Sequence, residues 1–138
     1  LSAIPMQTIC EPFIKRRALR HLQKGRIIIL AAGTGNPYFS TDTAATLRAA
    51  EMNCDAIFKG TSVDGVYDSD PKKNTSSKKY AFINYSKVLS DNLKVMDSSA
   101  ISLARDNNIP MVVFSILKEN SFRNAVEANG EFTVISED

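Results

Sequence analysis

The sequence has few of the residues that bind metals through sulfur or imidazole. Its 138 residues include two cysteines, Cys10 and Cys54, which lie far apart without Cys-x-x-Cys spacing, and one histidine, His21. A structural zinc site needs four such ligands, so these residues do not form one by themselves. Both cysteines are interpreted as reduced core residues of a cytoplasmic protein.

Long apolar runs, an excess of one charge and a signal-peptide pattern are absent as well. The longest apolar run, residues 27–32, is far too short to span a bilayer. With 17 basic and 15 acidic residues the formal net charge is +2, which gives no reason to expect nucleic acid or an anionic membrane as a partner. The chain begins with Leu1 rather than methionine, and we expect it to be a piece of a longer protein.

Helical and strand patterns alternate along the chain. From about residue 11, Ile14, Ala18 and Leu22 recur at helical spacing, and Gly25 stands where a left-handed cap would end this helix. The nearly continuous Ile and Leu of residues 26–32 are typical of a strand buried on both faces of a parallel sheet. Further helices are expected at about 42–53, at 86–91, after a cap at Asp97 or Ser98 and at 121–128, further strands at 55–59, 111–115 and 132–135, and a short hairpin between 66–67 and 80–83. The alternation predicts an α/β layered fold with a mostly parallel sheet, in which ligands bind beyond the carboxyl ends of the strands.

A polar loop, residues 33–42, follows the first predicted strand. Its two glycines let backbone N–H groups approach a ligand closely, and its aromatic rings offer a flat surface to a base or sugar. The loop leads into a helix N-terminus, which favours phosphate. It is neither a Walker loop nor Gly-x-Gly-x-x-Gly, so a plain turn capped by Thr41 stays an alternative. The candidate ligand-binding residues are Thr34, Gly35, Asn36, Pro37, Tyr38, Phe39, Ser40 and Thr41.

A second loop, residues 59–71, follows the next predicted strand. Asp64 followed by Gly65 favours a tight turn, and Tyr67 offers a ring that can lie against adenine. The carboxylates of Asp64, Asp68 and Asp70 suit Mg²⁺ or the hydroxyl and amino donors of a nucleotide. A turn without any ligand stays the alternative for this loop.

Taken together, the two loops resemble those of a known family. GTGNPYFSTDTAA, residues 33–45, and KGTSVDGVYDSDP, residues 59–71, are similar to the paired motifs of bacterial uridylate (UMP) kinases, which have the amino acid kinase fold. Residues 1–4, 93–97 and 104–106 also look like that family, so the resemblance covers nearly the whole chain. It implies a three-layer αβα sandwich with a mostly parallel central sheet, here incomplete, and it implies that residues 1–138 form the C-terminal nucleotide-binding part of the domain.

The resemblance also implies an activity. This family transfers the γ-phosphoryl group of ATP to UMP with Mg²⁺, giving UDP and ADP in pyrimidine nucleotide biosynthesis. Its members are cytoplasmic homohexamers, activated by GTP and inhibited by UTP.

The family's functional positions are carried over where the motifs match. Residues 34–41 match the UMP-binding loop. The ATP-binding positions match Thr61, Tyr67 and Asp70, and acidic positions near the phosphates match Asp42, Asp64 and Asp97, with no metal ligand assigned. Gly60 and Ser62 stand where the family usually has Ala and Lys; the missing lysine charge would alter ATP affinity.

Cations that would grip the transferring phosphoryl group are missing from the expected site. Phosphoryl transfer depends on positioning and charge neutralisation. In the resembling family these cations come from an N-terminal half with a Lys-Leu-Ser-Gly-Glu-type loop and a Gly-Gly-Gly-Asn-type turn, neither of which occurs here. Lys59 is placed beside the expected ATP site, where a phosphate contact and a solvent-directed side chain are both open. We therefore expect the fragment alone to be inactive; a non-catalytic nucleotide-binding regulatory module is the alternative, and a carboxylate or carbamate kinase a weaker third.

Overall fold

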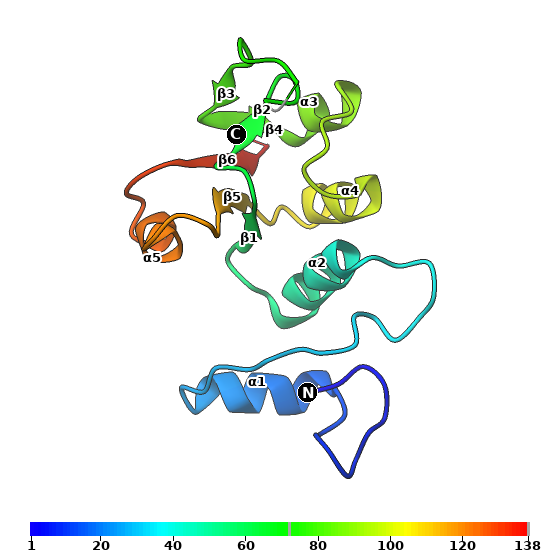
Figure 1. The fold of residues 1–138 in the computed structure, drawn as a ribbon. Helices are drawn as coiled ribbons and strands as arrows, with labels where there is room; N and C mark the ends of the chain where they lie inside the picture. The colour runs from blue at the N-terminus through cyan, green and yellow to red at the C-terminus, as the bar shows by residue number, and fades with distance from the viewer. Residues whose placement is uncertain (72, 138) are drawn as a thin grey trace.

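Helices and strands alternate through the part of the chain that the structure, a computed structural model, describes: residues 1–71 and 73–137. Figure 1 shows their arrangement. The elements are α1 (Lys15–Gln23), α2 (Thr41–Met52), β1 (Ile57–Thr61), β2 (Val66–Tyr67), β3 (Lys79–Tyr80), β4 (Phe82–Asn84), α3 (Tyr85–Ser90), α4 (Ser98–Asp106), β5 (Met111–Ser115), α5 (Ser121–Val126) and β6 (Phe132–Ser136).

The main sheet has four strands in the order β1-β5-β6-β4. β1 runs parallel to β5, with Ile57 opposite Met111, and β4 runs parallel to β6, while β5 and β6 are antiparallel. α3 and α4 lie on one side of these strands and α5 on the other (Figure 1). The predicted layered α/β fold with a mostly parallel sheet is confirmed. The predicted hairpin also forms, as the separate antiparallel pair β2 and β3.

The core lies between the main sheet and the helices α3 and α4. Met111 and Ile135 from the sheet and Ile101 from α4 are almost wholly buried there. Burial of side chains of this size stabilises the fold by roughly 1.5–3 kcal/mol each. Tyr85 is buried among them, donates its hydroxyl to the carbonyl of Ile109 and has its pKa raised to about 12 by that burial.

Local sequence signals explain where the helices begin and end. The Ser40 hydroxyl accepts from the N–H of Thr43 at 3.1 Å and caps α2, so the expected cap at Thr41 is one residue late. Asp97 caps α4, as predicted, by accepting from the N–H of Ala100 at 2.8 Å. Gly25 follows α1 with a φ of +69°, the left-handed conformation that ends helices.

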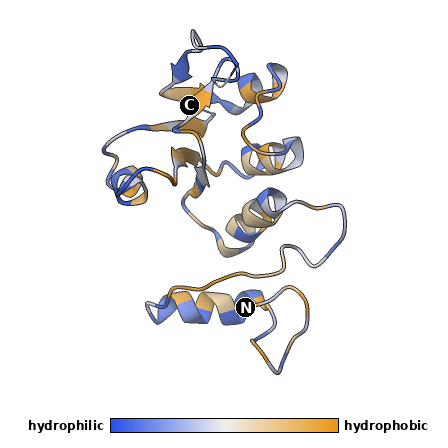
Figure 2. Ribbon diagram, viewed as in Figure 1, coloured by the Kyte–Doolittle hydropathy of each residue, from blue (hydrophilic) through white to orange (hydrophobic). Residues whose placement is uncertain are grey.

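Residues 26–32 do not form the buried strand that their composition predicts. They run extended beside α1, outside the main sheet, and Figure 2 shows them as an apolar segment away from the other strands. Ile27 is 95% exposed and Ile29 is 79% exposed. Their backbone pairs on one side only, where Ala31 donates to Leu1 and accepts from Ala3 at 2.9 and 3.1 Å. A strand of this kind is buried only between partner strands and covering helices, and within the described residues it has just this short partner.

The cysteines differ in their surroundings. Both are free thiols, as expected, but only Cys54 packs against the core, and burial there raises its pKa. Cys10 is half-buried in the turn before Glu11, so its interpretation as a core residue is wrong. In the described residues, no helix is long and apolar enough to cross a membrane.

Candidate functional site

The loop before α2 holds backbone conformations suited to a ligand surface. Gly35 has a φ of +76°, and a Cβ placed on it would lie 3.1 Å from the backbone oxygen of Ala3. The Thr34 hydroxyl accepts from the N–H of Asn36 at 3.1 Å, which folds the loop back on itself. Tyr38 is fully exposed and, unusually for a residue with a Cβ, has a φ of +69°. Of the predicted loop residues, Thr34 is half-buried and the rest of 35–41 are open to solvent.

Three side chains tie the start of α2 to the start of α4. Thr43 donates its hydroxyl to both carboxylate oxygens of Asp97, at 3.0 and 3.2 Å, and Ser40 donates to the same group. Burial on its own would raise the pKa of Asp97, but the hydrogen bonds from Ser40, the Ala100 N–H and Thr43 outweigh it and hold that pKa below its usual value. The tie fixes where the predicted UMP loop ends relative to α4.

Asp42 and Lys59 form an ion pair between α2 and β1. Both side chains are largely covered, with Asp42 at 22% and Lys59 at 26% exposure. Lys59 is thus held by a carboxylate rather than simply directed into solvent.

A cavity of about 520 Å³ lies beside the hairpin formed by β2 and β3. All three predicted ATP positions, Thr61, Tyr67 and Asp70, line it, although they come from two elements and a turn. Ser62, one of the departures from the family pattern, lines it too. The structure thus brings the three predicted residues of the second loop to one cavity.

Asp64 does not line this cavity, although its neighbours Val63 and Gly65 do. Its carboxylate accepts from the Tyr67 hydroxyl at 2.6 Å, from Lys118 at 3.2 Å and from Lys79 at 3.4 Å. The bond from Tyr67, helped by the lysines, holds the pKa of Asp64 well below its ordinary range. In this structure Asp64 anchors the phenol of Tyr67, whose own pKa is raised by the bond to that carboxylate.

A buried threonine that the sequence analysis did not single out attaches the hairpin to the main sheet. Thr133, on β6, is completely buried and accepts from the N–H of Val66 at 2.8 Å, while donating to the carbonyl of Tyr80. A Cβ on Gly65 would lie 2.5 Å from its hydroxyl oxygen. Thr133 therefore positions the strand that carries Tyr67. In the sequence, the one sign of this role is a polar residue within an apolar strand.

The glycine at position 60 is explained by its close contact with Ile116, which directly follows β5. A Cβ there would lie 2.2 Å from the Cγ2 of Ile116, far closer than side chains approach. The glycine and the bulky neighbour are therefore matched to each other.

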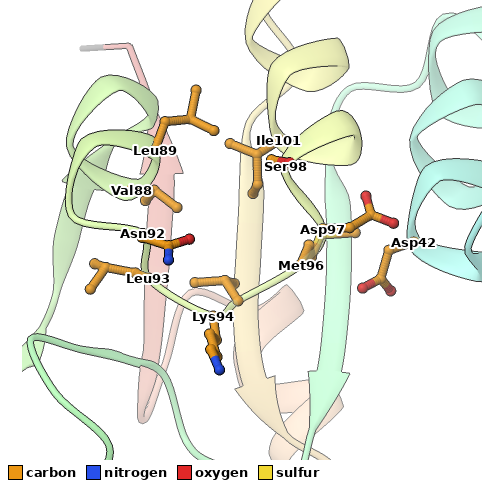
Figure 3. Close-up of a pocket in the computed structure, with 11 residues that line it drawn as sticks. Asp42, Val88, Leu89, Asn92, Leu93, Lys94, Met96, Asp97, Ser98 and Ile101 are labelled. Atoms are coloured by element: carbon orange, nitrogen blue, oxygen red, sulfur yellow. The ribbon is translucent and has the colours of Figure 1, made fainter.

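A second cavity, of about 490 Å³, opens between α3 and α4 (Figure 3). Asp42 and Asp97, two of the three predicted acidic positions, line it. It shares the stretch 92–95 with the cavity beside the hairpin, so the two cavities adjoin along that stretch. Residues 34–41 line neither cavity.

The acidic side chains are spread out rather than gathered. Among residues 1–71 and 73–137, no group of three or more His, Cys, Asp or Glu side chains is arranged to hold a metal ion. A divalent ion at this site would therefore need further oxygen ligands besides one or two of these carboxylates.

Known proteins share the sequence and the fold of this chain. The model of the amino acid kinase family matches residues 4–115. The uridylate kinase of Zymomonas mobilis is 60% identical over 134 residues, which is 97% of this chain and 55% of that protein, and the uridylate kinase of Anaplasma phagocytophilum is 59% identical over 136 residues, 99% of this chain and 56% of that protein. The crystal structure of UMP kinase from Bacillus anthracis superposes with a TM-score of 0.96 at 41% identity, covering 99% of this chain and 57% of that chain. The chain spans about half the length of the curated relatives it matches. Since the family model covers most of its length, this chain belongs to the amino acid kinase family.

Proposed function

We propose that residues 1–138 are the C-terminal nucleotide-binding part of a UMP kinase. The complete protein would transfer the γ-phosphoryl group of ATP to UMP and release UDP and ADP. The observation that carries the proposal is that Thr61, Tyr67 and Asp70 line one cavity, next to a second cavity lined by Asp42 and Asp97. Two adjoining cavities suit phosphate groups that must meet. The predicted acceptor loop, residues 34–41, lines neither cavity, but it leads directly into Asp42 and is tied through Ser40 to Asp97, and both carboxylates line the second cavity.

The hairpin cavity is the proposed ATP site. Tyr67 lines this cavity, its hydroxyl is held by Asp64, and its ring would offer adenine a flat apolar surface. Asp70 can accept from nucleotide hydroxyl or amino groups. Thr133 keeps the hairpin at the main sheet and acts only through these residues.

The loop 34–41 is the proposed UMP site. It ends at the N-terminus of α2, where free backbone N–H groups and the helix dipole favour an anion such as the UMP phosphate. Asp97 acts here as a positioning residue, because it holds Ser40 and Thr43 rather than a nucleotide.

Mg²⁺ with ATP fits this donor set. Mg²⁺ in kinases is held mainly by substrate phosphates with one or two carboxylates, so a cluster of three acidic side chains is not required. Asp42, which lines the cavity beside the junction, is the carboxylate that would hold the ion with the phosphates. When bound, the ion would neutralise charge on the phosphate chain.

The test compares UDP formation by the complete protein and by the 138-residue chain, each with ATP, Mg²⁺ and UMP. We expect the complete protein to form UDP and the chain alone to form none, because the chain lacks the cationic loops of the other half. Nucleotide binding without turnover by the complete protein would support the regulatory-module alternative instead. CMP and carbamate serve as competing acceptors, and use of either at the rate of UMP would contradict the assigned acceptor.

Assembly, regulation and location are proposed on the resemblance alone. The complete enzyme would be a cytoplasmic homohexamer activated by GTP and inhibited by UTP. Light scattering of the complete protein tests the hexamer, and initial rates with each nucleotide test the two effectors. A monomer whose rate responds to neither nucleotide would contradict both proposals.

A further inference from the structure

The two cavities share a stretch of lining that overlaps residues 93–97, which resemble the family but to which, apart from Asp97, no role was assigned. Asn92, Leu93, Lys94 and Val95 line both cavities. Among these shared residues only Lys94 carries a charge. Lys73 also lines the hairpin cavity, but it does not line the other one.

Three other lysines near the two predicted loops are already paired. Lys59 is bound to Asp42, and Lys79 and Lys118 are bound to Asp64. The amino group of Lys94, in contrast, makes no hydrogen bond or ion pair with any residue of the ranges 1–71 and 73–137. Figure 3 shows its side chain pointing in the direction in which β1 and β5 run, toward their carboxyl ends. Ligands of layered α/β folds bind at that edge.

An unpaired cation at this place has a clear chemical use. If the donor nucleotide lies in the hairpin cavity and the acceptor phosphate near Asp42, the transferring group lies where the cavities adjoin. The phosphate chain of ATP and the phosphate of UMP then meet beside two carboxylates, Asp42 and Asp97. These anions repel one another, and a cation between the phosphates, in addition to Mg²⁺ and the Lys59 that pairs Asp42, offsets that repulsion. Lysine suits this task, because its compact ammonium turns to follow a moving phosphate oxygen.

We propose that Lys94 contacts the phosphate chain of the nucleotides at the junction of the two cavities and stabilises the transferring phosphoryl group. This assignment rests on the proposed kinase function. In the reaction the bond between the γ-phosphorus and the β,γ-bridging oxygen breaks, and its electron pair stays on ADP. A new bond forms from an ionised phosphate oxygen of UMP to the same phosphorus, so no proton has to be removed. Lys94 supplies charge and takes no covalent part.

The kinetic test uses Lys94→Met and Lys94→Arg in the complete protein. Methionine keeps the length of the stem and removes the charge; we expect kcat/KM for ATP to fall about 10²-fold, by analogy with loss of one transition-state donor, mostly through kcat. Arginine keeps the charge and should restore activity to within about 10-fold of the wild type. Lys87→Met, on α3, is the matched control and should keep wild-type rates, because the ion pair that it loses, with Asp91, lies on the exposed surface. The Lys94 variants should melt at the wild-type temperature, because the Lys94 amino group makes no hydrogen bond or ion pair within the described ranges.

A second measurement follows the contact in the wild-type protein. Acetylation of lysines by acetic anhydride, read by mass spectrometry, should slow several-fold at Lys94 when ATP and Mg²⁺ are added, and should stay unchanged at Lys87. Equal acetylation of Lys94 with and without saturating ATP would overturn the assignment, and so would a Lys94→Met enzyme with wild-type kcat and KM. A wild-type protein that makes no UDP would instead overturn the proposed function, and the assignment with it.

Discussion

Replacing Asp97 by alanine should destabilise the protein and weaken UMP use in one step. The change removes the cap of α4, worth about 1 kcal/mol, and hydroxyl bonds from Ser40 and Thr43 to a charged group, worth about 1.5–3 kcal/mol. Because Asp97 is only half-buried, the lower part of that range applies, giving about 2.5 kcal/mol in total. In a complete protein of kinase size this lowers the melting temperature by about 5–10 °C.

The assay for Asp97→Ala combines differential scanning calorimetry with steady-state kinetics. The KM for UMP should rise more than the KM for ATP, because the lost bonds hold the end of the loop 34–41. Asp106→Ala, at the other end of α4, is the control, since in the part of the chain that the structure describes its carboxylate bonds only the adjacent Arg105. A melting temperature for Asp97→Ala equal to that of this control would refute the reasoning.

Acid should abolish the difference between wild type and Asp97→Ala. The pKa of Asp97 is lower in the folded protein than in the unfolded chain, where it is about 3.9. The unfolded state therefore binds more protons as the pH falls, and the contribution of the carboxylate is complete above the unfolded pKa and lost as the pH passes through the folded one. The difference in melting temperature should be constant from neutral pH down to about 4 and shrink below it. A difference that grows in acid would contradict this sign.

Three further changes test the hairpin and the sheet. Thr133→Val keeps the shape of a buried side chain but leaves a buried N–H without an acceptor, so the free energy of unfolding should fall by about 1–3 kcal/mol in urea denaturation, against no change for the exposed Thr75→Val. Gly60→Ala should destabilise by about 1–3 kcal/mol through its clash with Ile116, and the Ile116→Ala background should remove most of that effect in a double-mutant cycle; equal effects in both backgrounds would show that the clash is relieved elsewhere. Asp70→Asn should raise the KM for ATP and leave that for UMP unchanged; an unaltered ATP KM would point to a plain turn.

The sequence predicted those parts of the fold that depend on neighbouring residues. Asp97 as a cap and Gly25 as a helix end follow from the local backbone, and both are confirmed. The buried strand predicted at residues 26–32 is not formed. An apolar composition indicates that a segment would be stable as a buried strand, but pairing requires partner strands from elsewhere in the fold.

The candidate site also contains residues that the sequence predicted and residues that depend on tertiary contacts. The second loop motif led to residues that line the hairpin cavity, because residue types at fixed spacing are visible in the sequence, whereas residues 34–41 of the first motif line neither cavity. Thr133 belongs to no such motif, and Lys94 lies in a stretch that resembles the family but indicated no role for it. Their places depend on how loops and strands distant in the sequence come together. The surroundings of Asp64 were only partly visible: its nearest partner, Tyr67, is three residues away, but Lys79 and Lys118 lie 15 and 54 residues further along the chain.

The uncovered apolar segment 26–32 also bears on how the protein is made. In the proposed full-length kinase, the other half of the domain leaves the ribosome first, so partner strands are present when this segment emerges. The 138-residue chain expressed by itself has no such shelter. Its open backbone edge and the exposed Ile27 and Ile29 then offer a template on which a second copy can pair, the first step toward aggregation. In the proposed full-length kinase, the order of synthesis would therefore limit aggregation through the segment 26–32, which stays exposed when the 138-residue chain is made alone.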